Sequence, residues 1–234
     1  EIKILLEVDR KSNLKKISIL DNGFGMLPEE IQAAICEKSG SHLHRRHGKS
    51  DKGVRKLGKY GVGLPKASIS QCNKFTVWSW KSRSFKNSYF NFINIEDEKW
   101  INDGANVGVS KQGSPDEQLI KLAGFENEKS GSLVTWDDLD GITWARARWG
   151  QRSGLIPNLE FLVGRTYRKM ISGDKPELRI SCIVYDKNFN IKEEITFKPN
   201  DPLYLMADAN VSRTVLYNGE LWPTDKTLFD ENLE

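Results

Sequence analysis

Two apolar segments at the start of the chain are separated by only five residues, four of them polar, and this short gap constrains the fold most. The segments, EIKILLEVD and KKISILD, are rich in aliphatic and β-branched residues, and the RKSN between them is rich in turn formers. The sequence therefore predicts that the chain begins with a hairpin or near-hairpin.

Strand and helix patterns follow one another along the rest of the chain. Pro28 with Glu29 and Glu30 marks a helix start, because proline is tolerated in the first turn and acids are favoured there. A second helix is predicted in YGVGLPKASISQC, and a third in NLEFLVGRTYRKMI with Leu159, Leu162 and Met170 on one face. Strands are predicted in KFTVWSW, SYFNFINIE, SLVTWDDL, ELRISCIVYD and IKEEITFKP.

These elements do not alternate strictly as βαβ units. We therefore expect an α/β fold, a two-layer sandwich with a mixed, mainly antiparallel sheet, and not a doubly wound parallel sheet. The length of 234 residues suits one large domain, or one domain and the start of a second. The two tryptophans of WSWK alternate with Ser79, so both rings share one face of a strand, where core packing is the expected role.

Composition excludes several classes of protein. Hydrophobic residues make up 38% and charged residues 29%, as in an ordinary globular chain, and no run approaches the roughly 18 apolar residues of a membrane span. Cys36, Cys72 and Cys182 form no C-x-x-C pair, so neither a disulfide framework nor a cysteine zinc site is predicted. We expect no membrane partner and a cytoplasmic location, or a nuclear one in a eukaryotic cell. Because the first residue is Glu, we also expect a longer parent protein.

A long basic loop is predicted from about Glu37 to Lys59. Between His42 and Lys59 it carries seven Lys or Arg and one acid, Asp51. Loops of this length in compact domains are usually functional or disordered. Two interpretations remain open: the loop contacts nucleic acid, or it faces water until it closes over a triphosphate. No metal site is predicted at its three histidines, because no acid or cysteine completes a tetrahedral set.

The segment LDNGFGM joins a predicted strand to a predicted helix and has two interpretations. Asp, Asn and Gly are ordinary turn residues, so the segment can be structural only. Alternatively, Asp21 is presented to a ligand while Gly23 and Gly25 let that ligand approach the backbone. A carboxylate only accepts hydrogen bonds, so it can select an amine-bearing purine.

A second glycine-rich turn, GKYGVGLPKAS, opens the helix predicted near Pro65. Its spacing is G-x-x-G-x-G, and unpaired N–H groups at a helix start favour an anion such as phosphate. It is not a Walker A loop, because no G-K-[ST] follows, and it is not a Rossmann fingerprint, because no strand leads into it.

Together and in this order, the two turns resemble the motifs of the GHKL ATPases, which include gyrase B, heat-shock-ninety chaperones, histidine kinases, MutL and MORC proteins. The resemblance covers residues 1–175. It implies that Asp21 accepts a hydrogen bond from the adenine amine, that Gly23 and Gly25 allow close approach, and that Met26 packs on the base. In GSLV, Ser132 corresponds to a family hydroxyl behind the adenine.

The resemblance also implies how ATP and Mg²⁺ are held. The loop 37–59 corresponds to the family's lid. A Glu that acts as general base and an Asn that binds magnesium lie on a family helix whose position here precedes Glu1, so no catalytic residue is assigned. The segment that wraps the phosphates consists of Gly58, Tyr60, Gly61, Val62, Gly63 and Leu64.

Within the family, the chain looks most like MORC proteins and their bacterial relatives, which accompany DNA-modification and defence systems. The features behind this placement are GKYGVGLPKASISQC, GRTYRKMI and NDPLYL. The expected function is an ATP-driven switch whose intact form dimerises; the alternative is a nucleotide-sensing module without useful hydrolysis. By analogy, residues 176–234 hold terminal strands and begin the connection to a transducer-like domain.

Overall fold

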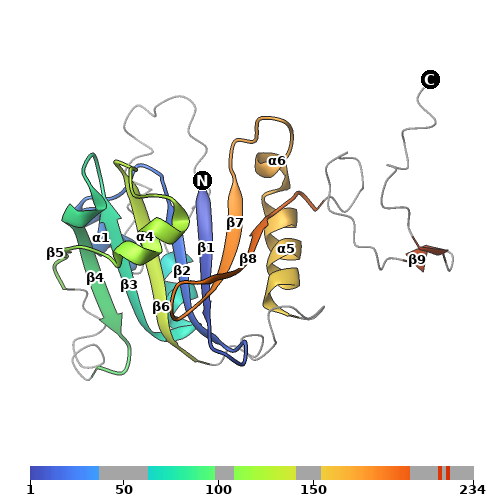
Figure 1. The fold of residues 1–234 in the computed structure, drawn as a ribbon. Coiled ribbons are helices and arrows are strands. Elements are labelled where there is room, and N and C mark those ends of the chain that lie inside the picture. Colours follow the sequence, from blue (N-terminus) through green and yellow to red (C-terminus); the bar gives the residue numbers. More distant parts are fainter. Residues whose placement is uncertain (37–62, 98–107, 141–153, 201–215, 218–219, 222–234) are drawn as a thin grey trace.

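One mixed sheet of eight strands forms the centre of the molecule in the computed structural model (Figure 1). The structure describes residues 1–36, 63–97, 108–140 and 154–200, and two short strands near the C-terminus. Across the sheet the strands are β5 (Lys111–Gly113), β4 (Ser88–Asn94), β3 (Cys72–Trp80), β6 (Gly131–Leu139), β2 (Leu14–Asp21), β1 (Ile2–Val8), β7 (Ile180–Asp186) and β8 (Ile191–Thr196).

The predicted hairpin is confirmed. Strands β1 and β2 pair antiparallel, with Leu5 opposite Ser18. Strand β1 also pairs with β7, and this is the one parallel pair among the eight described strands of the sheet. The mixed, mainly antiparallel sheet with its helices confirms the predicted α/β class.

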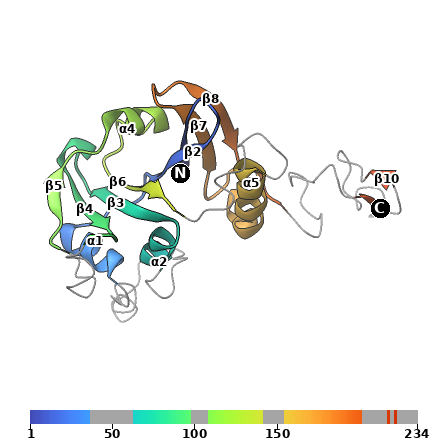
Figure 2. The ribbon, with the colours of Figure 1, turned by 90° about the horizontal axis from the view of Figure 1, so that it is seen from below.

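Helices lie on both faces of the sheet (Figure 2). One face carries α1 (Pro28–Ile35), α2 (Gly63–Ile69), α5 (Leu155–Thr166) and the single turn α6 (Arg168–Ile171). The other face carries the short helix α4 (Glu117–Ala123). A 3₁₀ turn, η2 (Phe85–Asn87), precedes β4. None of the helices in the described part of the chain is long and apolar enough to cross a membrane.

The alternation of side chains along the strands divides the core between the two faces. Leu5 and Leu20 point toward α4 and pack with Trp80. Leu6 and Ile17, one residue out of phase with them, pack under α5. A third cluster under α1 contains Ile31, Ile35, Cys72, Phe75, Val77 and Ile93. The expected packing role of the WSWK pair is confirmed, since Trp80 is fully buried and Trp78 packs against the same cluster.

Two expectations about the middle of the chain were wrong. Leu162 was expected on the buried face of its helix, but it is 59% exposed. Helix α5 begins at Leu155, three residues before the predicted segment, and its buried residues are Leu155, Ile156 and Gly164. Between the strands β4 and β6, where no element was predicted, the structure contains β5 and α4.

Strands β7 and β8 follow residue 175, yet they lie in the same sheet as β1. The division of the chain into residues 1–175 and 176–234 stays a prediction. Near the C-terminus, β9 (Leu216–Tyr217) and β10 (Glu220–Leu221) pair antiparallel as a separate two-stranded sheet.

Candidate functional site

Three polar side chains form a row across neighbouring strands at one end of the sheet. Asp21, the last residue of β2, is paired in register with Ser132 of β6, and Ser132 is paired with Ser79 of β3. Residues directly opposite each other in antiparallel strands point to the same face. Ser79 alternates with Trp78 and Trp80, which pack toward α4, so the row lies on the face that carries α1 and α2.

Ser79 ties the turn after β2 to the centre of the sheet. Its side chain is fully buried, and its Oγ accepts a hydrogen bond from the backbone N–H of Met26 at 2.8 Å. The same Oγ donates to the carbonyl oxygen of Gly131 at 2.8 Å. Ser79 was not among the residues predicted for the site. The available signal was a small hydroxyl side chain between two tryptophans.

The hydroxyl of Ser132 is oriented by that of Ser79, 3.0 Å away. A serine hydroxyl has one proton to donate. Because Ser79 donates its proton to Gly131, the proton between the two hydroxyls comes from Ser132. Ser132 therefore has only acceptor lone pairs left for a ligand.

Asp21 keeps one carboxylate oxygen available. Its Oδ1 accepts a hydrogen bond from the N–H of Gly23 at 2.9 Å, and its Oδ2 accepts none from any described residue. Burial raises the pKa of Asp21 above its usual value, while the Gly23 N–H and the positive charge of the terminal amine act in the opposite direction. Asp21 and Ser132 thus present two neighbouring acceptors.

The packing of the turn itself restricts positions 23 and 25 to glycine. Gly25 has a φ of 65°, and a Cβ built on it would overlap the carbonyl oxygen of Trp80. A Cβ on Gly23 would lie 2.7 Å from Oδ1 of Asp21. The structural interpretation of LDNGFGM is therefore supported, because the glycines fit the turn against β3 and Asp21. The presentation of Asp21 to a ligand stays a prediction.

Helix α2 is anchored to the same face of the sheet as this row. Nε1 of Trp136 donates to the buried Oγ of Ser68 at 2.9 Å, and Sγ of Cys72 contacts the carbonyl oxygen of Ser68 at 3.2 Å. Leu64 and Met26 pack against the same apolar cluster under α1. A Cβ on Gly63, by contrast, would meet no described atom within 4 Å, so packing in the described part of the chain does not require a glycine there.

Part of the predicted site lies outside the described residues. This applies to Gly58, Tyr60, Gly61 and Val62, to the basic loop 37–59, and to its three histidines. The described residues contain no group of three or more His, Cys, Asp or Glu side chains that could hold a metal ion. A cavity of about 870 Å³ is found elsewhere, between the turns that follow β1 and β7. It lies at the opposite end of β1 and β2 from Asp21.

Comparison with known families gives a match over the first part of the chain. Residues 1–112 match the family described as histidine kinase-, DNA gyrase B-, and HSP90-like ATPase. The matched range contains both glycine-rich turns, whereas Ser132 lies beyond it. The corresponding comparison with curated proteins gives no match.

Proposed function

We propose that this chain, whose residues 1–112 match a GHKL-type ATPase family, binds ATP with its adenine at the row formed by Asp21 and Ser132. The observation that supports this most directly is the pair of acceptors on one sheet face. An adenine amine offers two N–H donors, whereas a guanine or hypoxanthine base offers a carbonyl acceptor at the same position. Two acceptors against that carbonyl would leave buried polar groups unpaired.

The described residues fit the purine better than they fit the metal. Asp21, Ser132 and Met26 would contact the base, and Gly63 would leave room for phosphates at the start of α2. A bound Mg²⁺ would neutralise charge on the phosphates. No described residue is assigned as its ligand, and no described carboxylate is assigned as a general base. The roles of Gly58, Gly61 and the loop 37–59 remain part of this proposal.

At the level of the whole protein, we propose an ATP-driven conformational switch of the MORC-like type, which dimerises when ATP is bound. The second candidate is a nucleotide-sensing module without useful turnover. The rate of phosphate release with Mg²⁺ separates the two candidates, because only the switch hydrolyses ATP. The Asp21→Asn variant is the control: release that persists in it comes from a contaminating ATPase.

Titration calorimetry with ATP tests the adenine assignment. The Asp21→Asn change keeps the shape of the side chain but places an amide donor against the adenine amine. We expect ATP affinity to fall by at least about tenfold, which corresponds to about 1.4 kcal/mol. The control is Asp174→Asn on an exposed loop, which changes the net charge equally. Unchanged ATP affinity in a folded Asp21→Asn protein would contradict the assignment.

A further inference from the structure

Two turns at the end of the sheet opposite Asp21 share one sequence pattern. The turn between β1 and β2 has the sequence DRKSNLK from Asp9 to Lys15, and the turn between β7 and β8 has DKNFNIK from Asp186 to Lys192. In each, an aspartate is followed by an asparagine four residues later and a lysine six residues later. We call these two segments the paired turns.

The paired turns have the same hydrogen bonds. Oδ1 of Asp9 accepts the N–H groups of Lys11 and Asn13, each at 2.8 Å, and the Asn13 amide donates to Oδ2 at 2.9 Å. Oδ1 of Asp186 accepts the N–H groups of Asn188 at 2.9 Å and Asn190 at 3.1 Å, and the Asn190 amide donates to the same carboxylate.

These hydrogen bonds favour the charged form of both aspartates and occupy their carboxylate oxygens. They lower the pKa of Asp9 and of Asp186 to about 2, with the asparagine side chain as the largest cause in each case. The third residue after each aspartate, Ser12 or Phe189, has a φ near 60°, at 63° and 61°. The two turns therefore have the same backbone conformation and the same hydrogen bonds at these positions.

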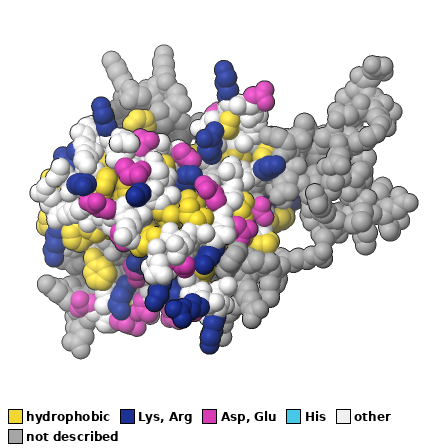
Figure 3. All heavy atoms as spheres, viewed as in Figure 1, with side chains coloured by type: hydrophobic (Ala, Val, Ile, Leu, Met, Phe, Trp, Pro, Cys, Tyr) yellow, Lys and Arg dark blue, Asp and Glu magenta, His cyan; other side chains and the backbone are white. Residues whose placement is uncertain are grey.

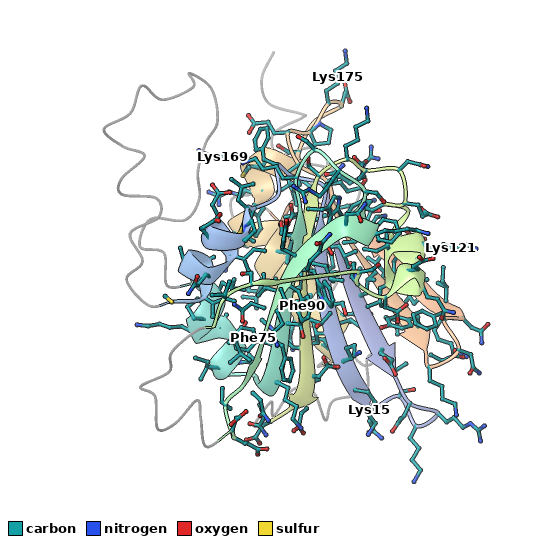
Figure 4. All side chains as sticks on the ribbon, turned by 90° about the vertical axis from the view of Figure 1, so that its left-hand side faces the viewer. Lys15, Phe75, Phe90, Lys121, Lys169 and Lys175 are labelled. Atoms are coloured by element: carbon teal, nitrogen blue, oxygen red, sulfur yellow. The ribbon has the colours of Figure 1, made fainter. Side chains whose placement is uncertain are left out.

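The parallel pairing of β1 with β7 places the paired turns side by side. Val8 is in register with Asp186, so both turns leave the sheet at the same end. The cavity of about 870 Å³ lies between them and is lined by both. Figure 3 shows Lys and Arg side chains gathered at the lower edge of the molecule, where the β1–β2 turn lies in Figure 1. Figure 4 shows Lys15 at this end.

The charges that line this cavity are unequal. It has three acids, Glu7, Asp9 and Asp186, against five cations. Two of the cations are paired with the turn aspartates, Lys15 with Asp9 at 3.6 Å and Lys192 with Asp186 at 3.2 Å. The other three are exposed and form no ion pair with any described residue: Arg10, Lys11 and Lys187.

The backbone of the paired turns offers a ligand few donors. The N–H groups of residues 11–13 bond to the side chain or carbonyl of Asp9, and those of residues 188–190 bond to Asp186. An extended peptide is usually held by backbone hydrogen bonds, which these turns do not supply. A cation is disfavoured as well, because both turn carboxylates are already occupied. Apart from Glu7, the unpaired charged groups that remain are the positive side chains of Arg10, Lys11 and Lys187, on both sides of a groove.

We propose that the groove between the paired turns binds the phosphodiester backbone of a nucleic acid. Lys and Arg contact such a backbone mainly through charge, without reading its sequence. Arg10 and Lys11 contact the phosphates from one turn, and Lys187 contacts them from the other. This site is separate from the proposed ATP site and does not depend on it, because the seven residues of β1 separate them by roughly 20 Å.

The test compares two triple charge reversals in the full 234-residue chain. The first is Arg10→Glu, Lys11→Glu and Lys187→Glu. The matched control reverses three exposed lysines elsewhere, which Figure 4 labels: Lys121→Glu, Lys169→Glu and Lys175→Glu. Both variants change the net charge from +3 to −3, so a general charge effect is equal in the two. Anisotropy of a labelled DNA duplex and of a labelled RNA strand is measured between about 0.05 and 0.2 M salt.

We expect the wild type and the control to bind at least one of these polymers, with affinity that falls with salt. The first variant should bind at least about tenfold more weakly than the control, and its slope of log affinity against log salt should be smaller by about 2 to 3. Circular dichroism checks folding, and Arg10→Gln, Lys11→Gln and Lys187→Gln replace the reversals if the first variant unfolds. Equal binding by both variants, no binding of either polymer by the wild type, or equally tight binding of a polyglutamate peptide would overturn the proposal.

Discussion

The backbone N–H of Met26 donates to the buried Oγ of Ser79 at 2.8 Å, which ties the turn after β2 to the central strand β3. Ser79→Ala removes this acceptor and the bond to Gly131, and leaves a partly buried N–H without its partner. We expect a loss of about 1 to 3 kcal/mol in the free energy of unfolding, measured by urea titration. ATP affinity, measured by calorimetry, should fall too, because Asp21 and Ser132 lose their support.

A matched control separates these two effects. Ser88 of β4 is also a fully buried serine, and its Oγ donates to the carbonyl oxygen of Gly113 of β5 at 3.0 Å. It precedes Tyr89, which is paired with Ser79, so its side chain lies on the other face of the sheet from the row. Ser88→Ala should lower stability by a similar amount and leave ATP affinity unchanged. If both variants bind ATP as the wild type does, Ser79 has no part in the nucleotide site.

Gly25→Ala should disrupt the turn locally. Gly25 has a φ of 65°, and the added Cβ would overlap the carbonyl oxygen of Trp80, so the turn has to move away from β3. The control is Gly173→Ala, where φ is 83° and a Cβ would meet no described atom within 4 Å. Thermal unfolding should show a larger loss of stability for Gly25→Ala than for Gly173→Ala. A loss of the same size would show that backbone strain, and not the contact with Trp80, decides the residue at position 25.

Asp21→Asn should have a pH-dependent effect on stability without nucleotide. Burial raises the pKa of Asp21 in the folded state above its usual value of 3.8, so the folded protein binds more protons than the unfolded one between these two pKa values. The burial of Asp21 therefore lowers the free energy of unfolding as pH rises through this window, and the loss is complete above the folded-state pKa. The variant lacks this cost. We expect its unfolding midpoint to be equal to or higher than that of the wild type at pH 7, with the difference shrinking toward pH 3. A deficit at pH 7 that disappears at pH 3 would mean that the charged form of Asp21 stabilises the fold.

Local patterns predicted the elements better than their pairing. The hairpin, the start of α1 at Pro28 and the helix after Gly63 follow from turn residues and proline positions, which are short-range signals. The pairing of β1 with β7 joins residues about 180 positions apart, for which one sequence gives no local signal. Helix α4 was missed because its seven residues lie within a polar stretch.

In the candidate site, too, local motifs were predictive and long-range contacts were not. Asp21 and Ser132 were predicted from motifs, and the register of β2 and β6 brings them opposite each other. The role of Ser79 depends on two strand registers and on the path of the turn, so its position in the sequence does not reveal it. The face of α5 was misjudged because Leu162 is apolar yet 59% exposed, and burial there depends on how the helix lies on the sheet.

The central claim, that Asp21 reads the amine of adenine, is tested most directly by calorimetry with ATP and inosine triphosphate on the wild type and on Asp21→Asn. Inosine carries a carbonyl where adenine carries the amine. The Gly23 N–H requires an acceptor at the position of Oδ1, so in the variant the amide nitrogen takes the place of Oδ2 and offers a donor to the base. The wild type should prefer ATP by at least about 100-fold, or about 2.8 kcal/mol, and the variant should prefer inosine triphosphate. Equal affinity of the wild type for the two nucleotides, or an unchanged preference in a folded variant, would contradict the claim.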